Sequence, residues 1–164
     1  MTIVELGPAD WQEFRAIRLR ALADAPDAFA RTLTEFERED EETWRPRLAA
    51  PNPILVVLDE GTPVAMGGGL VPPGETDLMF IWGMWTAPEA RGHGHGRALV
   101  SWLLDWALAR SISTVELHVT EGNDSARGLY ESCGFVGTGD WEPLREGSPL
   151  QIELLRRTTR PPGG

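Results

Sequence analysis

The chain has 164 residues, of which 41% are hydrophobic and 24% charged, so it has the size and composition of one ordinary globular domain and is neither disordered nor fibrous. All 15 basic residues are arginine, and the formal net charge of −10 disfavours nucleic acid and anionic membranes as partners. The absence of lysine excludes a lysine nucleophile, a pyridoxal Schiff base and a Walker-type phosphate loop.

Short strands and helices alternate along the chain, with turn residues between them. The patterns predict strands over 2–6, 54–58, 64–71, 78–85, 114–119, 135–141 and 150–155, and helices over 11–23, 34–48, 97–110 and 123–133. Capping boxes, Asp10 with Glu13 and Thr34 with Glu37, are expected to start the first two helices. The order predicts an α/β (α+β) domain whose central sheet is mixed, mostly antiparallel, with about six to seven strands and about four flanking helices. One domain is expected over 1–156, followed by a flexible C-terminal tail over 157–164.

A glycine loop joins the strand that ends near Thr86 to the helix expected from Arg97. Gly92, Gly94 and Gly96 stand at every second position, so successive backbone N–H groups can point into one concavity at the start of a helix. Such a loop can bind a pyrophosphate without lysine. The dinucleotide fingerprint fails, because Arg97 stands where its third glycine belongs. A plain flexible turn is the alternative.

Two motifs on either side of the helix over 97–110 resemble the GNAT acetyltransferase superfamily. Arg91-Gly92-His93-Gly94-His95-Gly96 matches its R-x-x-G-x-G/A signature, and Thr86-Ala87-Pro88 resembles its V-x-P strand end. Downstream, 123–135 resembles its N-x-x-A-x-x-L-Y-E-x-x-G-F segment. The resemblance is dense from Trp82 to Phe135 and weaker before it, although 18–29 is similar to the first helix of many bacterial members, and it covers essentially the whole domain.

The resemblance implies that acetyl-CoA is the acyl donor. The residues implied to bind acetyl-CoA are Met84, Trp85, Thr86, Arg91, Gly92, His93, Gly94, His95, Gly96, Arg97 and Asn123. Tyr130 is the implied catalytic residue, which donates a hydrogen bond or a proton to the departing CoA sulfur. Taken alone, Tyr130 could be a core residue and Asn123 an N-cap. A backbone N–H near Trp85 or Thr86 is expected to polarise the thioester carbonyl.

The sequence departs from the family at the expected base and in the loop. Where many members carry a glutamate on the strand before V-x-P, this chain has Phe80, so the base candidates are His118, Glu116 and Glu121. His95 replaces an aliphatic residue beneath the loop and is expected to fill the same pocket. Cys133 raises the alternative of an acetyl-cysteine route, although it lies on an apolar helix face.

No segment resembles a signal peptide, and no apolar run reaches the roughly 18 residues that span a bilayer. The one cysteine permits no internal disulfide, and the three histidines predict no metal site without further ligands. We therefore expect a cytoplasmic protein without a membrane partner, either a monomer or a homodimer.

The expected function is direct transfer of the acetyl group of acetyl-CoA to a primary amine of a small molecule or of a peptide or protein N-terminus. The alternative is a catalytically silent acetyl-CoA-binding sensor or interaction module. The acidic run over 35–42 has two interpretations: a solvated helix face, or a surface that attracts a cationic acceptor.

Overall fold

The structure is a computed structural model that describes residues 1–49 and 51–158. Its seven strands form one sheet in the order β1-β2-β3-β4-β5-β7-β6. The strands are β1 (Thr2–Glu5), β2 (Ile54–Asp59), β3 (Thr62–Leu70), β4 (Leu78–Thr86), β5 (Thr114–Thr120), β6 (Val136–Pro143) and β7 (Gln151–Thr158). Neighbouring strands are antiparallel except β4 and β5, which are parallel. The predicted mixed, mostly antiparallel sheet is confirmed.

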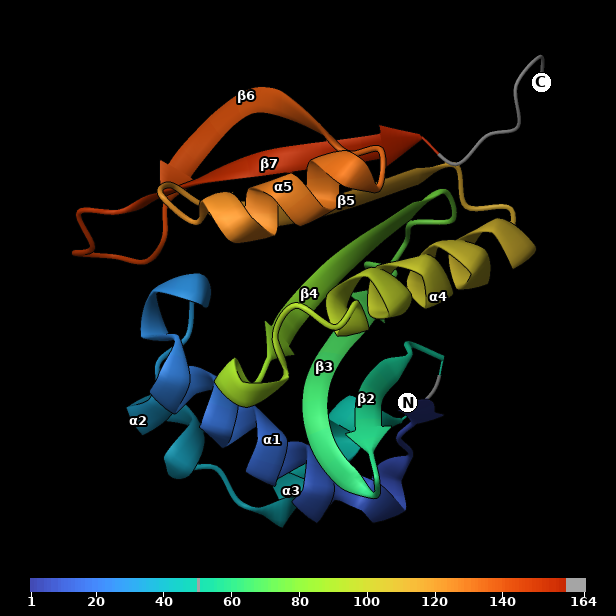
Figure 1. Ribbon diagram of the computed structural model, residues 1–164, viewed down its shortest axis with the longest axis vertical. Coiled ribbons are helices and arrows are strands. Elements are labelled where there is room, and N and C mark those ends of the chain that lie inside the picture. The colour runs from blue at the N-terminus through green and yellow to red at the C-terminus, as the bar shows by residue number, and fades with distance from the viewer. Residues whose placement is uncertain (50, 159–164) are drawn as a thin grey trace.

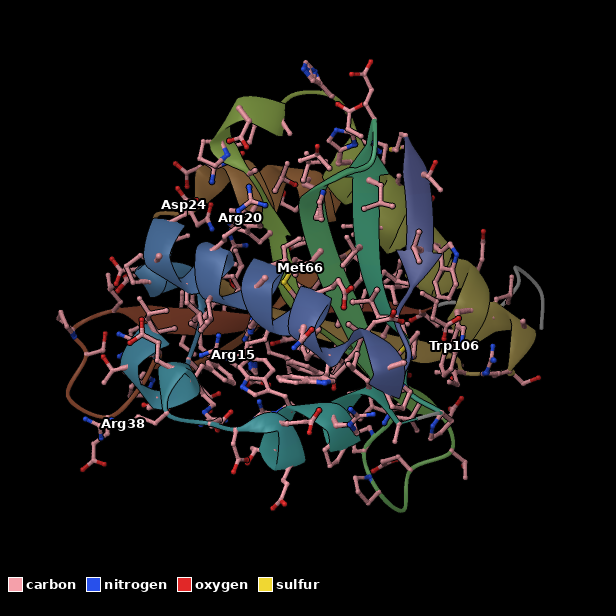
Figure 2. The ribbon with its side chains drawn as sticks, turned by 90° about the horizontal axis from the view of Figure 1, so that it is seen from below. Arg15, Arg20, Asp24, Arg38, Met66 and Trp106 are labelled. Atoms are coloured by element: carbon pink, nitrogen blue, oxygen red, sulfur yellow. The ribbon has the colours of Figure 1, made fainter. Side chains whose placement is uncertain are left out.

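Helices cover both faces of this sheet (Figure 1). The α-helices are α1 (Trp11–Asp24), α2 (Leu33–Glu37), α3 (Glu41–Trp44), α4 (His95–Ala109) and α5 (Asp124–Ser132), and 3-10 turns cover Pro8–Asp10, Pro26–Ala28, Arg45–Leu48 and Pro88–Ala90. Alternate residues of β3 face opposite helices, as the strand period of two requires. Gly67 and Gly69 face the leucines of α4, whereas Met66 lies on the α1 side, where Figure 2 shows α1 crossing the strands.

The α1 side of the core is built on aromatic contacts. Trp44 is completely buried and meets Phe14 edge to face, with ring centroids 5.4 Å apart. Its indole Nε1 donates a hydrogen bond to the carbonyl oxygen of Glu39 at 3.2 Å, so the buried polar atom has a partner. These contacts fix α3 against α1 and anchor the segment that follows.

Both predicted capping boxes are wrong. The Asp10 carboxylate accepts a hydrogen bond from the backbone N–H of Gly7 at 2.8 Å, because a 3-10 turn precedes α1 and takes the side chain. The next helix is capped by Thr32, whose hydroxyl accepts from the N–H of Glu35, and not by Thr34. The helix expected over 34–48 is divided into α2, α3 and a 3-10 turn, since the Asp40 side chain caps a new helix at its centre.

Two further boundaries differ from expectation. Helix α4 begins at His95 rather than Arg97, so the last part of the glycine loop is already helical. Strand β7 continues to Thr158, past the expected end of the domain at 156. Residues 159–164 of the expected tail lie outside the described residues.

A bulge in β4 opens the sheet at its centre. Between the pairs Met66–Trp85 and Gly68–Trp82, the β4 residues Gly83 and Met84 lie opposite the single β3 residue Gly67. Gly83 has a φ of +67°, a left-handed conformation that glycine adopts without strain. In the described chain, β4 pairs with β5 only over Leu78–Phe80. Beyond that point the two strands diverge, and one edge of β4 is left open (Figure 1).

Candidate active site

A cavity of about 480 Å³ lies between the end of β4, the glycine loop and the helices α4 and α5. We call it the donor cavity, because every residue expected to bind the donor acetyl-CoA lines it except His93. Those that do are Met84, Trp85, Thr86, Arg91, Gly92, Gly94, His95, Gly96, Arg97 and Asn123. The side chain of His93 is exposed, and its ring meets that of His95 edge to face at 6.2 Å. The residues predicted from the sequence to bind acetyl-CoA therefore lie together in the wall of one cavity.

The glycine loop has the geometry of an anion cradle. Gly92 and Gly94 both have a φ of +82°, and a Cβ added at either would meet no atom within 4 Å, so the concavity is open. Gly94 is the N-cap of α4, and the first N–H groups of a helix have no acceptor within it. A Cβ on Gly96 would lie 2.9 Å from the Leu129 side chain, so this glycine lets α4 approach α5. The described residues therefore fit a pyrophosphate held by backbone N–H groups.

One carboxylate joins the parts of this cavity. The Oδ2 atom of Asp24, at the end of α1 in Figure 2, accepts hydrogen bonds from Trp85 Nε1 at 2.9 Å and from Arg91 Nη2 at 2.7 Å. Arg91 Nε also donates to the carbonyl oxygen of Thr86 at 3.0 Å. The guanidinium of Arg91 is thus committed to holding the loop against the strand end.

The other charged or polar residues of the loop are also held by the protein. His95 is buried beneath the loop, with Nδ1 3.1 Å from the sulfur of Met1, as expected for a side chain that fills this pocket. Arg97 Nη2 donates to the hydroxyl of Ser132 at 2.7 Å, which ties α4 to α5. Backbone N–H groups therefore form most of the anion cradle, and Nε2 of His95, which is buried in the wall of this cavity without a hydrogen-bond partner among the described residues, is a further polar atom open to a ligand.

The end of β4 presents a free backbone edge to the donor cavity. The N–H of Ala87 donates to Val64 on the β3 side, so strand alternation turns the N–H of Thr86 to the opposite, open side. The Thr86 carbonyl points the same way, since it accepts from Arg91. This edge can pair with an extended ligand chain or polarise a carbonyl group.

A second cavity, of about 70 Å³, lies where β4 and β5 diverge. We call it the acceptor cavity, and Phe29, Trp82, Gly83, His118 and Thr120 line it. Its wall and that of the donor cavity share five residues, namely Ala28, Met84, Asn123, Ala126 and Tyr130. The two cavities therefore meet at Tyr130.

Tyr130 combines a core position with a place in the site. It is 7% exposed, and its ring lies edge to face with Phe135 at 6.2 Å. Burial raises the pKa of its hydroxyl well above the usual value, so the group is neutral at physiological pH. Asn123 has a similar double position: its Oδ1 atom accepts from the N–H of Ala126 at 3.3 Å and caps α5, while the residue lines both cavities.

Of the three base candidates, only His118 lines either cavity. Glu116 is paired with Arg156 at 2.8 Å, and Glu121 accepts from the backbone N–H of Gln151 at 2.8 Å. Burial lowers the pKa of His118, although the charges of Glu142 and Glu116 oppose this shift. The imidazole is therefore neutral near pH 7 and can accept a proton.

Cys133 lies at the C-cap of α5 and lines neither cavity. An acetyl-cysteine route would need its thiol beside the donor, so the geometry supports direct transfer. Within the described residues, no three His, Cys, Asp or Glu side chains are grouped to hold a metal ion. No helix in that part of the chain is long and apolar enough to cross a membrane.

Sequence reasoning missed the contribution of the segment after α1. Ala25 and Ala28 line the donor cavity, and Phe29 lines the acceptor cavity. The hydroxyl of Thr120 on β5 donates to the carbonyl of Asp27 at 2.7 Å and holds the 3-10 turn there. Small apolar residues carry no chemical signal, so only this tertiary contact reveals their place.

Comparison with known proteins gives a consistent result. A model of the acetyltransferase (GNAT) family matches residues 14–135. The mycothiol acetyltransferase of Beutenbergia cavernae is 34% identical over 130 residues, which cover 78% of this chain but 42% of that protein. This chain therefore spans less than half of that relative.

Solved structures share the fold at lower sequence identity. The ribosomal-protein-alanine N-acetyltransferase of Brucella melitensis has a TM-score of 0.76 at 24% identity, covering 96% of this chain and 99% of that one. A Salmonella typhimurium structure with the cofactor acetyl-CoA has a TM-score of 0.80 at 19% identity, covering 100% of this chain and 96% of that one.

Proposed function

The chain belongs to the acetyltransferase (GNAT) family, and from this premise we propose that it transfers the acetyl group of acetyl-CoA directly to a primary amine of a small molecule or of a peptide N-terminus. The observation that carries the proposal is the position of Tyr130 in the walls of both the donor and the acceptor cavity. A hydroxyl that lies between the donor and the acceptor can interact with the sulfur of the C–S bond that breaks.

The donor side is formed by the glycine loop and the open edge of β4. The N–H groups of the loop and of the first turn of α4 bind the pyrophosphate, and the edge near Thr86 pairs with the pantetheine arm. The N–H of Thr86 polarises the thioester carbonyl. Asn123, fixed as the cap of α5, contacts the pantetheine from the other side.

The acceptor side supplies the proton acceptor. A typical primary amine is protonated near pH 7, and an ammonium group cannot attack a carbonyl. Neutral His118 takes one ammonium proton and later releases it to solvent. The amine then attacks the carbonyl carbon, the C–N bond forms, and the C–S bond breaks.

Tyr130 assists the departing sulfur. The new nitrogen must lose one more proton, and the sulfur must gain one, so a hydroxyl between them can relay it. The raised pKa of Tyr130 keeps the hydroxyl protonated, and it makes full transfer to a thiolate with a pKa of about 8.5 uphill. Tyr130 therefore acts chiefly as a hydrogen-bond donor to the departing sulfur. Where its hydroxyl proton does move to the sulfur, the proton lost by the new nitrogen replaces it on the tyrosine oxygen.

The test is Tyr130→Phe, followed by CoA thiol release with a panel of amines. Turnover should fall by about 10- to 1000-fold with little change in acetyl-CoA affinity, because the hydroxyl acts mainly in the transition state. Cys133→Ser, at the C-cap of the same helix, is the matched control and should remain active. An acetylated Cys133 together with an inactive serine variant would overturn direct transfer. Binding of acetyl-CoA without transfer to any amine would support the silent module instead.

A further inference from the structure

A third cavity, of about 410 Å³, lies on the α1 side of the sheet and has Arg18, Arg31, Phe36, Arg47 and Trp82 in its wall. We call it the arginine cavity. Trp82 lines both this cavity and the acceptor cavity. Arg18 also adjoins both, because its Nη1 atom lies 3.2 Å from the position of a Cβ added to Gly83, which lines the acceptor cavity. The guanidinium of Arg18 therefore stands at the boundary between the two spaces.

Arg18 is a buried cation without a counter-ion. It is 7% exposed, and its guanidinium lies over the ring of Phe29 at 4.6 Å and that of Trp82 at 5.6 Å. Within the described residues, Nη1 has no hydrogen-bond partner and no carboxylate pairs with the group. Burial, and then the charges of Arg47 and Arg31, lower the pKa of Arg18 to about 10, so it remains charged at neutral pH.

The other two arginines of the cavity are already neutralised in part. Arg31 pairs with Glu35 at 3.1 Å and with Glu39 at 2.8 Å, and Arg47 pairs with Glu39 at 2.6 Å. Nη1 of Arg47 is buried without a partner, like that of Arg18. Three guanidinium groups thus face two carboxylates, and the positive charge left over lies deepest, on Arg18.

Burying an unpaired charge costs stability, and a ligand that supplies the opposite charge would offset this cost. The planar guanidinium matches a carboxylate, which can accept two parallel hydrogen bonds. The burial of Arg18 among aromatic rings lowers the local dielectric constant, which strengthens such a pair. Phe36 and Trp82 leave apolar surface for the rest of a small molecule.

We propose that the acceptor is a small amine that carries a carboxylate, and that Arg18 binds this carboxylate while the amine nitrogen occupies the acceptor cavity. The inference rests on the proposed function and names the substrate class of the same site. An amino acid carries its amine and its carboxylate on the same carbon atom. The two groups are therefore close enough to occupy the acceptor cavity and the adjoining arginine cavity together. In a protein N-terminus the α-carboxylate next to the amine is replaced by a peptide bond, so this class of acceptor is disfavoured.

The test compares matched acceptors on matched variants. The common L-amino acids, their amides and the corresponding decarboxylated amines are assayed by CoA thiol release with the wild type, Arg18→Met and Arg38→Met. Methionine is apolar and fills similar space, so Arg18→Met removes a buried unpaired charge and should not lower the melting temperature. Arg38, exposed and pointing away from the molecule in Figure 2, is the control for loss of one positive charge.

The wild type should prefer the best amino acid over its amide and its decarboxylated amine by about 100-fold or more in kcat/KM, since a site built for a polar group rejects analogues that lack it. Arg18→Met should lose most of this preference through KM and keep its thermal shift with acetyl-CoA. Arg38→Met should behave as wild type. The proposal would be overturned if the wild type had the same kcat/KM for the amino acid, its amide and its decarboxylated amine. It would also be overturned if Arg18→Met kept the wild-type preference for the amino acid.

Failure of the proposed function gives a different result. In that case acetyl-CoA produces no thermal shift, or no amine is acetylated at all. The carboxylate site is then tested by calorimetric titration of the same compounds. Binding of an amino acid that requires both its carboxylate and Arg18 supports the site, and absence of such binding refutes it.

Discussion

Replacing Asp24 with alanine should loosen the end of α1 from both the strand end of β4 and the glycine loop. The change leaves Trp85 Nε1, on a residue that is 6% exposed, without its acceptor, and an unsatisfied buried donor costs about 1–3 kcal/mol. The ion pair with Arg91 contributes less, about 0–1 kcal/mol, because the Arg91 side chain is 53% exposed. The two contributions sum to about 1–4 kcal/mol, so the free energy of unfolding should fall by about 2.5 kcal/mol, the middle of that range.

For a domain of 164 residues, each kcal/mol shifts the melting temperature by about 2–4 °C, so Asp24→Ala should melt about 5–10 °C lower. Urea unfolding of three variants separates the two bonds. Asp24→Asn keeps an oxygen for Trp85 and should lose about 1 kcal/mol, and Arg91→Gln should lose less than about 1 kcal/mol. Acetyl-CoA affinity, measured by calorimetry, should fall most in Asp24→Ala. If Asp24→Ala and Arg91→Gln are equally stable, the indole bond does not hold the site together.

Three further changes test other parts of the site. Because burial lowers the pKa of His118, kcat should hold until the pH falls below the ordinary histidine value of about 6.5, and His118→Gln should lower kcat and remove this acid limb. Gly94→Glu should abolish the thermal shift caused by acetyl-CoA, whereas Gly94→Asn, which tolerates the left-handed φ of +82°, should keep most of it. Glu39→Gln should lower the KM of a carboxylate-bearing acceptor, because it frees charge on Arg31 and Arg47; a higher KM would refute this reading of the arginine cavity.

The parts of the site that depend on local sequence could be predicted. The glycine loop, the strand end before it and the cap at Asn123 each lie within a few residues of their partners, so turn and capping rules locate them. The same holds for the hairpin between β2 and β3, whose turn residue Gly61 has a φ of +81°. The division of the helix predicted over 34–48 was missed although its signal is also local: Asp40 caps a new helix there, and the apolar spacing alone does not show this break.

The acceptor side depends on contacts between distant residues. The bulge at Gly83 opens β4 from β5, and Thr120 holds the turn that closes the cavity. The one signal of the bulge within the strand over 78–85 is Gly83, because the apolar run there has no alternation to interrupt. The sequence left three weak base candidates, and only the structure shows that Glu116 and Glu121 have other partners while His118 lines the acceptor cavity.

Arg18 did leave a signal in the sequence. It stands four residues after Phe14 and three before Ala21, on the stripe that a helix buries, and both of those neighbours are buried. A charged residue at a core position of an amphipathic helix needs a partner, and none of the positions three or four residues away from Arg18 carries a carboxylate. Periodicity alone could therefore have marked Arg18 as functional, although not what it binds.

The acidic run over 35–42 shows why net charge is a weak guide to specificity. Its count of carboxylates predicted attraction of cations, yet Glu35 and Glu39 pair with Arg31 and Arg47 on their own segment. Although desolvation opposes it, hydrogen bonds from both arginines keep the pKa of Glu39 below its usual value, so these pairs persist at neutral pH. The charge that a ligand meets in the cavity is the one left unpaired, and that charge is the positive one on Arg18. The charge of a surface and the charge inside a cavity can therefore differ in sign, and binding in the cavity follows its buried groups, whose charge salt screens less than it screens surface charges.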